Sequence, residues 1–189
     1  MRFKIVQAGD PVLRQVAQSL TTGEILKEDV QRLIRDMRDT MHDAPGVGLA
    51  APQVGVSIQL AVIEDQEAFL KNLPAQELEL KGRGPVPFHV LINPNIVSAG
   101  DDKVEFHEGC LILSGFSALV PRAKSVRVEY LNEHGEPCVA DATGWYARIL
   151  QHEIDHLRGG LYIDRMQSRT FTTLENWTRY GKVKPVSGE

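Results

Sequence analysis

His152 and His156 stand four positions apart, and Glu153 directly follows the first histidine. If this segment is helical, residues four apart lie one above the other on a single face, so both imidazoles can reach one metal ion. Glu153 would then lie beside the two histidines, close to a bound water. The spacing therefore predicts a metal site with a carboxylate placed next to the water.

A chance match on a solvated helix is the alternative to a metal site. Leu150, Ile154 and Leu157 give the segment an apolar character that indicates burial. Two buried histidines with a glutamate between them need compensating partners, because an unpaired polar group is costly to bury. The apolar surroundings therefore favour the metal site.

A third ligand is needed, because catalytic zinc-type centres usually take three protein ligands and leave the fourth position to water. Glu175, downstream of His156, has a placement that suits a metalloprotease of the thermolysin type. Cys110 lies upstream in the stretch Glu108–Leu111, at the expected end of a strand. Spacing alone leaves both candidates open.

Two helices are expected to frame such a site. The first covers about residues 24–42, after a capping box formed by Thr21 and Glu24. Its apolar positions recur at helical intervals: Val30, Leu33, Ile34, Met37 and Met41. The second covers about 145–157, carries the two histidines and ends at the glycine pair 159–160.

The remaining elements read as short strands joined by turns. They are expected at residues 58–63, 89–93, 104–107, 118–120 and 125–130, with a hairpin turn at 132–135. Because strands outnumber helices, the sequence predicts an α+β fold: one domain over 1–189, with mostly antiparallel sheets packed around the central helix that carries the histidines. The polar stretch 64–87 is expected to be a surface insertion, and 182–189 a flexible tail.

The bulk properties exclude several classes of protein. A net charge of −4 gives no reason to expect binding to nucleic acid or to an anionic membrane surface. No apolar run approaches the roughly 20 residues needed to cross a bilayer, and the first residues lack a signal-peptide core. The two cysteines do not form the dense pattern of a secreted scaffold. We therefore expect a soluble protein in a reducing compartment.

Other conspicuous side chains have ordinary interpretations. Asp155 points off the face that carries the two histidines, so a salt bridge is expected for it. Cys138 is expected to be a small buried thiol, and Trp177 to lie on a peripheral helix. Surface or hydrogen-bonded positions are expected for four histidines: His42, His89, His107 and His134.

A third segment, residues 46–53, makes the combination of motifs much more specific than the two histidines alone. Residues 46–53 read Gly-Val-Gly-Leu-Ala-Ala-Pro-Gln, and they lack the lysine and the hydroxyl residue of a phosphate-binding loop. Together with Glu-Gly-Cys-Leu at 108–111 and Gln-His-Glu-Ile-Asp-His-Leu at 151–157, this segment strongly resembles the three motifs of the peptide deformylase family, in the family's order. The resemblance extends over about residues 5–166. It implies a metal-dependent amidase that removes the N-formyl group from the initiator methionine of new polypeptides.

The resemblance also implies the site residues. Cys110, His152 and His156 would bind the metal, and Glu153 would be the general base and acid. The side-chain amide of Gln53 and the backbone N–H of Leu111 would bind the formyl oxygen. Glu108 and Arg122 would form a supporting ion pair. Val47 and Gly48 would line the substrate and pair with its backbone. Two interpretations are open for Trp145 and Ile149: ordinary core positions, or the lining of an apolar pocket for the methionine side chain beside His152.

The implied metal is Fe²⁺, with Zn²⁺, Ni²⁺ or Co²⁺ as possible substitutes. The implied partners are N-formyl-methionyl peptides at the ribosome exit. The type resembled occurs in mitochondria and in some bacteria, and we expect the bacterial cytoplasm, with the mitochondrial matrix as the alternative for a trimmed chain. Ile112 departs from the family pattern, in which a serine follows Glu-Gly-Cys-Leu.

Two other functions remain as alternatives. One is a metalloendopeptidase that uses Glu175 in place of Cys110. The other, motivated by Ile112, is a non-catalytic member of the fold that binds formylated peptides without cleaving them.

Overall fold

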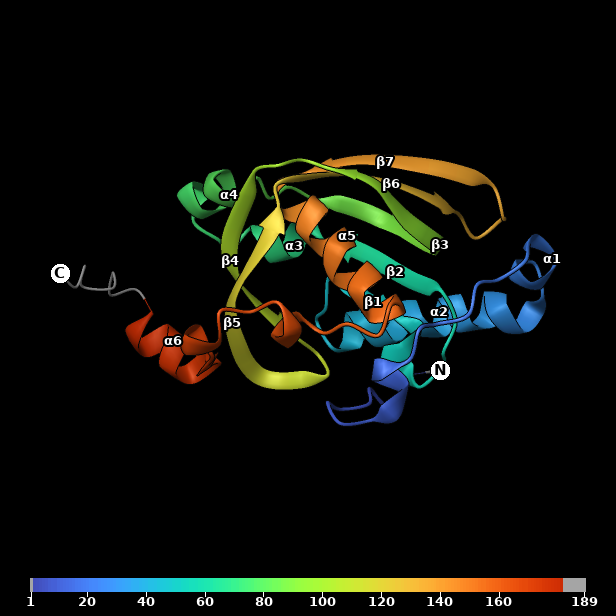
Figure 1. Cartoon of the computed structure of the whole chain (residues 1–189), viewed down its shortest axis with the longest axis horizontal. Coiled ribbons are helices and arrows are strands. Elements are labelled where there is room, and N and C mark those ends of the chain that lie inside the picture. Colours follow the sequence, from blue (N-terminus) through green and yellow to red (C-terminus); the bar gives the residue numbers. More distant parts are fainter. Residues whose placement is uncertain (1, 182–189) are drawn as a thin grey trace.

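A computed structural model describes residues 2–181, which form two β-sheets and the helices that cover them (Figure 1). The five-stranded sheet has the order β1 (Gly48–Ala50), β2 (Leu60–Asp65), β3 (Val86–Ala99), β6 (Ser125–Leu131) and β7 (Pro137–Thr143). The three-stranded sheet has the order β4 (Lys103–Cys110), β5 (Leu113–Ala123) and β8 (Thr172–Thr173). The α-helices are α1 (Thr22–Ile25), α2 (Glu28–Asp43), α3 (Glu67–Leu70), α4 (Ala75–Lys81), α5 (Gly144–Leu157) and α6 (Leu174–Tyr180). Short 3₁₀ turns occupy Pro11–Arg14, Ala51–Val54, Tyr162–Asp164 and Ser168–Thr170.

The strand pairings that build these two sheets are antiparallel. Helix α5 runs through the middle of the molecule and contacts strands of both sheets (Figure 1). The predicted α+β fold, with antiparallel sheets around the helix that carries His152 and His156, is therefore confirmed.

Strand β2 shows why the five-stranded sheet needs a helix on each face. Its residues are buried at nearly every position, and successive side chains of a strand point to opposite faces. Leu60 and Val62 pack in one cluster with Met37 of α2, whereas Ile63 packs in another with Leu150 of α5. The sheet is thus covered by α2 on one face and by α5 on the other, and α5 is held at a fixed position.

The first predicted helix is wrong in one respect. The structure has two helices in place of one, because Lys27 has extended backbone angles (φ −69°, ψ 144°). The capping box of Thr21 and Glu24 caps the short helix α1 and not the long one. The amide of Gln31 donates to the carbonyl of Ile25 at 2.9 Å and so satisfies an acceptor at the end of α1.

The strands of residues 86–131 are longer than predicted, because β3, β4 and β5 extend past the apolar stretches that marked them. The predicted insertion, 64–87, contains α3 and α4. Its end contacts the start of α5, where the backbone N–H of Trp145 donates to Gly82 at 3.4 Å. The predicted tail, 182–189, lies outside the described residues. Within 2–181, no helix combines the length and the apolar character that a membrane crossing requires.

Glycines fix both ends of α5. At its start, Gly144 has φ +61°, and a Cβ there would lie 2.6 Å from the carbonyl oxygen of Gly82. Beyond its end, Gly159 has φ +75°, and a Cβ would lie 2.8 Å from the carbonyl oxygen of Arg14. Both positions therefore require glycine, and the predicted stop at 159–160 is correct.

Candidate metal centre

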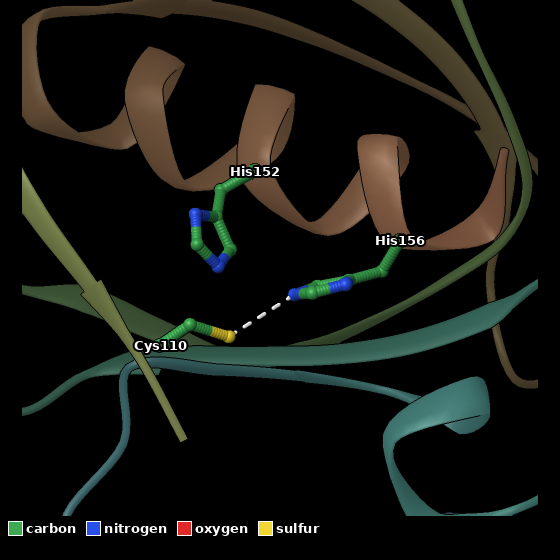
Figure 2. A group of neighbouring side chains, drawn as sticks. All are labelled: Cys110, His152 and His156. Carbon is green, nitrogen blue, oxygen red and sulfur yellow. Dashed lines mark hydrogen bonds between the residues drawn. The ribbon is translucent and has the colours of Figure 1, made fainter. Parts of the chain in front are cut away.

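Three side chains from different parts of the chain meet at one point. The potential ligand atoms of Cys110, His152 and His156 all lie within 4.8 Å of one another. Cys110 Sγ is 3.2 Å from His156 Nε2, and Figure 2 shows the sulfur and the two rings facing a common space. A thiolate with two imidazoles is a ligand set that suits zinc and other divalent transition metals. The structure thus holds a possible Cys/His metal site.

Regular elements position these ligands. The two histidines project from successive turns of α5, with ring centroids 4.9 Å apart. Cys110 is the last residue of β4, where the pairing with β5 shifts register between Glu108 and Cys110. Such irregularities often occur next to active sites, where they aim a side chain.

Glu108 links the ligand helix to the three-stranded sheet. Its carboxylate accepts hydrogen bonds from Arg122 (2.9 Å for each oxygen), from Arg148 (2.6 Å) and from His152 Nδ1 (3.0 Å). Because Nδ1 of His152 donates to Glu108, its other nitrogen, Nε2, is left for a metal. Burial opposes the ionisation of Glu108, but the bonds from His152 and Arg122 outweigh it and hold its pKa well below the usual range.

Replacing Glu108 with glutamine is expected to lower the free energy of unfolding of the metal-free protein by about 3–5 kcal/mol, the usual cost of leaving a buried charge unpaired. Arg148, whose side chain is 3% exposed, would lose its carboxylate partner. The deficit should shrink as the pH falls below 4.5, because the unfolded wild-type chain then takes up a proton at Glu108, whereas the folded protein, in which the pKa of Glu108 is lowered, does not.

Urea denaturation of both proteins measures this deficit. Glu105→Gln on the exposed side of the same strand is the control and should cost little. A deficit of the same size in both variants would contradict a special role for Glu108.

Glu153 lies against the backbone of β1. A Cβ on Gly48 would fall 2.2 Å from Glu153 Oε1, so the carboxylate occupies the space that a side chain at this position would fill. Burial raises the pKa of Glu153 to about 7, although the charges of His152 and Arg122 oppose the shift. Its Oε2 atom is buried and has no hydrogen-bond partner within residues 2–181. A buried oxygen without a partner fits a site where a water or a substrate group completes the bonding.

The amide of Gln53 has a defined orientation. Its oxygen accepts the backbone N–H of Ala50 at 2.7 Å, and its nitrogen lies 3.5 Å from Cys110 Sγ. Since the oxygen is held by the backbone, the N–H₂ end is the one that faces the ligands.

The centre lies in a cavity of about 330 Å³, within the usual size range of ligand pockets. This cavity is lined by all the predicted metal-binding, catalytic and substrate-binding residues except His156, which is buried. They come from β1 and the residue before it, the 3₁₀ turn after β1, the end of β4 and the residue after it, and α5. Val47, Trp145 and Ile149 form part of its apolar wall.

Some predicted residues lie elsewhere or differ in detail. Glu175 is in α6, 78% exposed and 3.3 Å from Arg179, and it is not part of the ligand group. Asp155 pairs with Arg122 and Arg165, as expected. Cys138 is only partly buried, so the expectation of a buried thiol is wrong, because its strand β7 lies at the edge of the sheet.

Ile112, where the motif departs from the family pattern, does not line the cavity. Its side chain is buried with Leu13 and Leu161 in a separate apolar cluster. Ser114, two residues further, lines the cavity instead.

The sequence did not reveal several residues at the site. Arg148 stands four positions before His152, so helical periodicity could have placed it on the ligand face. Phe116 and Leu174 also line the cavity, but they lie outside the three motifs. No local signal marks them.

The comparisons with known proteins agree on one family. A family model described as polypeptide deformylase matches residues 2–172. Peptide deformylase 1A, a chloroplastic protein of Solanum lycopersicum, is 45% identical over 91% of this chain and 62% of its own length. Peptide deformylase 3 of Streptomyces avermitilis is 47% identical over 90% of this chain and 74% of its own length. The chain thus spans 62% of the tomato relative.

Solved structures give the same result. A peptide deformylase of Acinetobacter baumannii bound to Met-Ala-Ser has a TM-score of 0.77 and 29% identity, over 88% of this chain and 99% of the other. The peptide deformylase of Thermotoga maritima has a TM-score of 0.73 and 36% identity, with the same coverage.

Proposed function

The chain belongs to the polypeptide deformylase family, and from this membership we propose that it hydrolyses the N-formyl group of formyl-methionyl polypeptides and releases formate. One observation supports the proposal most strongly: Cys110, His152 and His156 converge in a cavity where Glu153 and the amide of Gln53 lie beside them. The substrate class is that of new polypeptides leaving the ribosome.

Cys110, His152 and His156 are the proposed metal ligands. Glu108 binds His152 through Nδ1, which leaves Nε2 for the metal, and one sulfur with two nitrogens is a common zinc-type ligand set. Fe²⁺ is the proposed native ion, and Zn²⁺, Ni²⁺ or Co²⁺ are its proposed substitutes. A divalent ion bound there polarises a carbonyl oxygen and brings the pKa of a coordinated water to about 7.

Glu153 is the proposed general base and acid. It accepts a proton as water attacks the formyl carbon, and it returns a proton to the amine nitrogen when the C–N bond breaks. The negative oxygen formed in between is stabilised by the N–H₂ group of Gln53 and by the backbone N–H of Leu111. Burial raises the pKa of Glu153. A metal cation bound beside Glu153 would lower this pKa again, because opposite charge favours the ionised carboxylate.

The substrate backbone is proposed to pair with β1. This strand is at the edge of the five-stranded sheet, with β2 on one side only, and Val47 and Gly48 line the cavity. An open strand edge can take an extended peptide as an additional strand. The methionine side chain then lies against Val47, Trp145 and Ile149, an apolar wall that suits a flexible thioether.

The substrate preference tests the proposed function. The rate constant kcat/KM is expected to be much higher for a formyl-Met tripeptide than for its acetyl-Met equivalent. If Gln53, Leu111 and a bound metal held the carbonyl oxygen as proposed, the carbonyl carbon would have room for hydrogen but little for methyl. A formyl-Asp tripeptide should also be slower. Equal rates on formyl and acetyl substrates would indicate a general amidase, and internal cleavage a metalloendopeptidase.

Gly48→Ala is expected to reduce kcat by roughly 10- to 100-fold, because small displacements of a reacting group have effects of this order. The new Cβ would overlap Glu153 Oε1 and push the carboxylate from its place, while metal per chain should not change. Gly23→Ala is the matched control, since a Cβ there meets no atom within 4 Å. A fully active Gly48→Ala protein would show that the carboxylate position is not critical.

The proposed compartment is the bacterial cytoplasm, and the mitochondrial matrix is the alternative. Two cysteines without a disulfide suit a reducing compartment. Related proteins come from bacteria, chloroplasts and mitochondria.

A further inference from the structure

The segment 171–180 concentrates exposed apolar side chains. Of the nine exposed large hydrophobic residues found in 2–181, four lie in this segment. They are Phe171, Leu174, Trp177 and Tyr180, between 37% and 59% exposed. Such a concentration is unusual on a soluble surface and commonly marks an interaction site. We call these four residues the C-terminal patch.

The C-terminal patch is fixed to the rim of the cavity. Strand β8 pairs with Phe116 and Ser117 of β5, and the ring of Phe116 is stacked on that of Phe171, with centroids 5.1 Å apart. Trp177 is stacked on His107 at 3.6 Å. These contacts hold α6 against the three-stranded sheet, as Figure 1 shows for α6 and β5.

The patch is continuous with the catalytic cavity. Leu174 and Phe116 line the same cavity as Cys110 and Glu153, and Leu174 is also 48% exposed at its mouth. The charged residues Glu175 and Arg179 of α6 pair with each other at 3.3 Å, so their opposite charges offset one another beside the patch. A chain that leaves the cavity on this side therefore meets the exposed apolar side chains of Leu174 and its neighbours in the C-terminal patch.

We propose that the C-terminal patch binds the substrate polypeptide downstream of its second residue and that it favours apolar side chains at the third and fourth positions. The inference rests on the proposed function, because it takes the formylated polypeptide as the occupant of the cavity. Leu174 is the central contact, since it belongs both to the cavity and to the patch. The protein therefore selects among formyl-methionyl chains by residues that lie beyond the methionine.

The test compares three substrates: formyl-Met-Ala, formyl-Met-Ala-Ser-Ser-Lys and formyl-Met-Ala-Leu-Leu-Lys. Each pentapeptide rate is divided by the same protein's rate on the dipeptide, which corrects for any change at the catalytic centre. For the wild type, kcat/KM is expected to be about three- to tenfold higher with Leu-Leu than with Ser-Ser, through a lower KM, because only part of the buried apolar area appears as affinity. In Leu174→Ser this ratio should fall to near one.

Leu26→Ser is the matched control. Leu26 is 58% exposed and follows α1, which lies at the opposite end of the molecule from α6 (Figure 1). Its Leu-Leu to Ser-Ser ratio should equal that of the wild type. An unchanged ratio in Leu174→Ser, or no preference in the wild type, would overturn the inference.

Two further outcomes are distinguishable. If the wild type cleaves none of the three peptides, the proposed function itself fails. If sedimentation shows a dimer that Leu174→Ser converts to monomer while the substrate ratio stays the same, the patch joins two copies of the chain and the inference is wrong.

Discussion

Glu153→Ala is expected to retain the metal and to lose nearly all turnover, by about 10²- to 10⁴-fold for acid–base help alone. One carboxylate serves both proton transfers in the proposed mechanism, so no other described residue at the cavity replaces it. The fold should not suffer, because Glu153 Oε2 is buried without a hydrogen-bond partner among residues 2–181. Removing such a group relieves a desolvation cost.

The measurement is kcat on a formyl-Met tripeptide, together with metal per chain and the thermal midpoint. Glu153→Gln is the companion variant: it keeps the shape of the side chain but cannot accept the proton, and it should be as inactive. Turnover near that of the wild type in either variant would remove Glu153 from the mechanism.

Cys110→Ala is expected to lower bound metal from about one ion per chain to near zero, because a site with three protein ligands has no spare donor. His152→Ala and His156→Ala should behave in the same way. The ligand atoms of the three residues lie within 4.8 Å of one another, so each is placed to bind the same ion.

Two control variants make this result specific. Cys138→Ala removes the other cysteine, which lies in β7 away from the cavity, and it should keep the metal. Glu175→Ala should also keep it, because that side chain is exposed on α6. Full metal content in Cys110→Ala, or its loss in Glu175→Ala, would contradict the proposed ligand set.

The sequence predicted the placement of the side chains best where their geometry is local. His152 and His156 stand one helical turn apart, so their common face follows from the helix alone. Arg148 follows the same rule, but its role depends on Glu108, which accepts a hydrogen bond from Arg148 only in the folded protein. The convergence of Cys110 on the histidines required the family resemblance, since spacing left Glu175 as an equal candidate.

The sequence predicted less where tertiary contacts decide. The break at Lys27 depends on the bond from Gln31 to the carbonyl of Ile25, which no periodicity reveals. The position of Leu174 at the cavity depends on the pairing of β8 with β5, a two-residue ladder too short for a strand signal. In both cases the deciding contact is a hydrogen bond, which apolar periodicity does not register.

Removal of the formyl group from methionyl peptides by this chain is tested most directly by the release of formate. Protein purified without oxygen, with its metal measured, is mixed with formyl-Met-Ala-Ser. We expect one formate for each new free amine. Both products should disappear after chelation of the metal and return when Fe²⁺ is added. Binding of the peptide to metal-loaded protein without formate release, or cleavage at an internal bond, would contradict it.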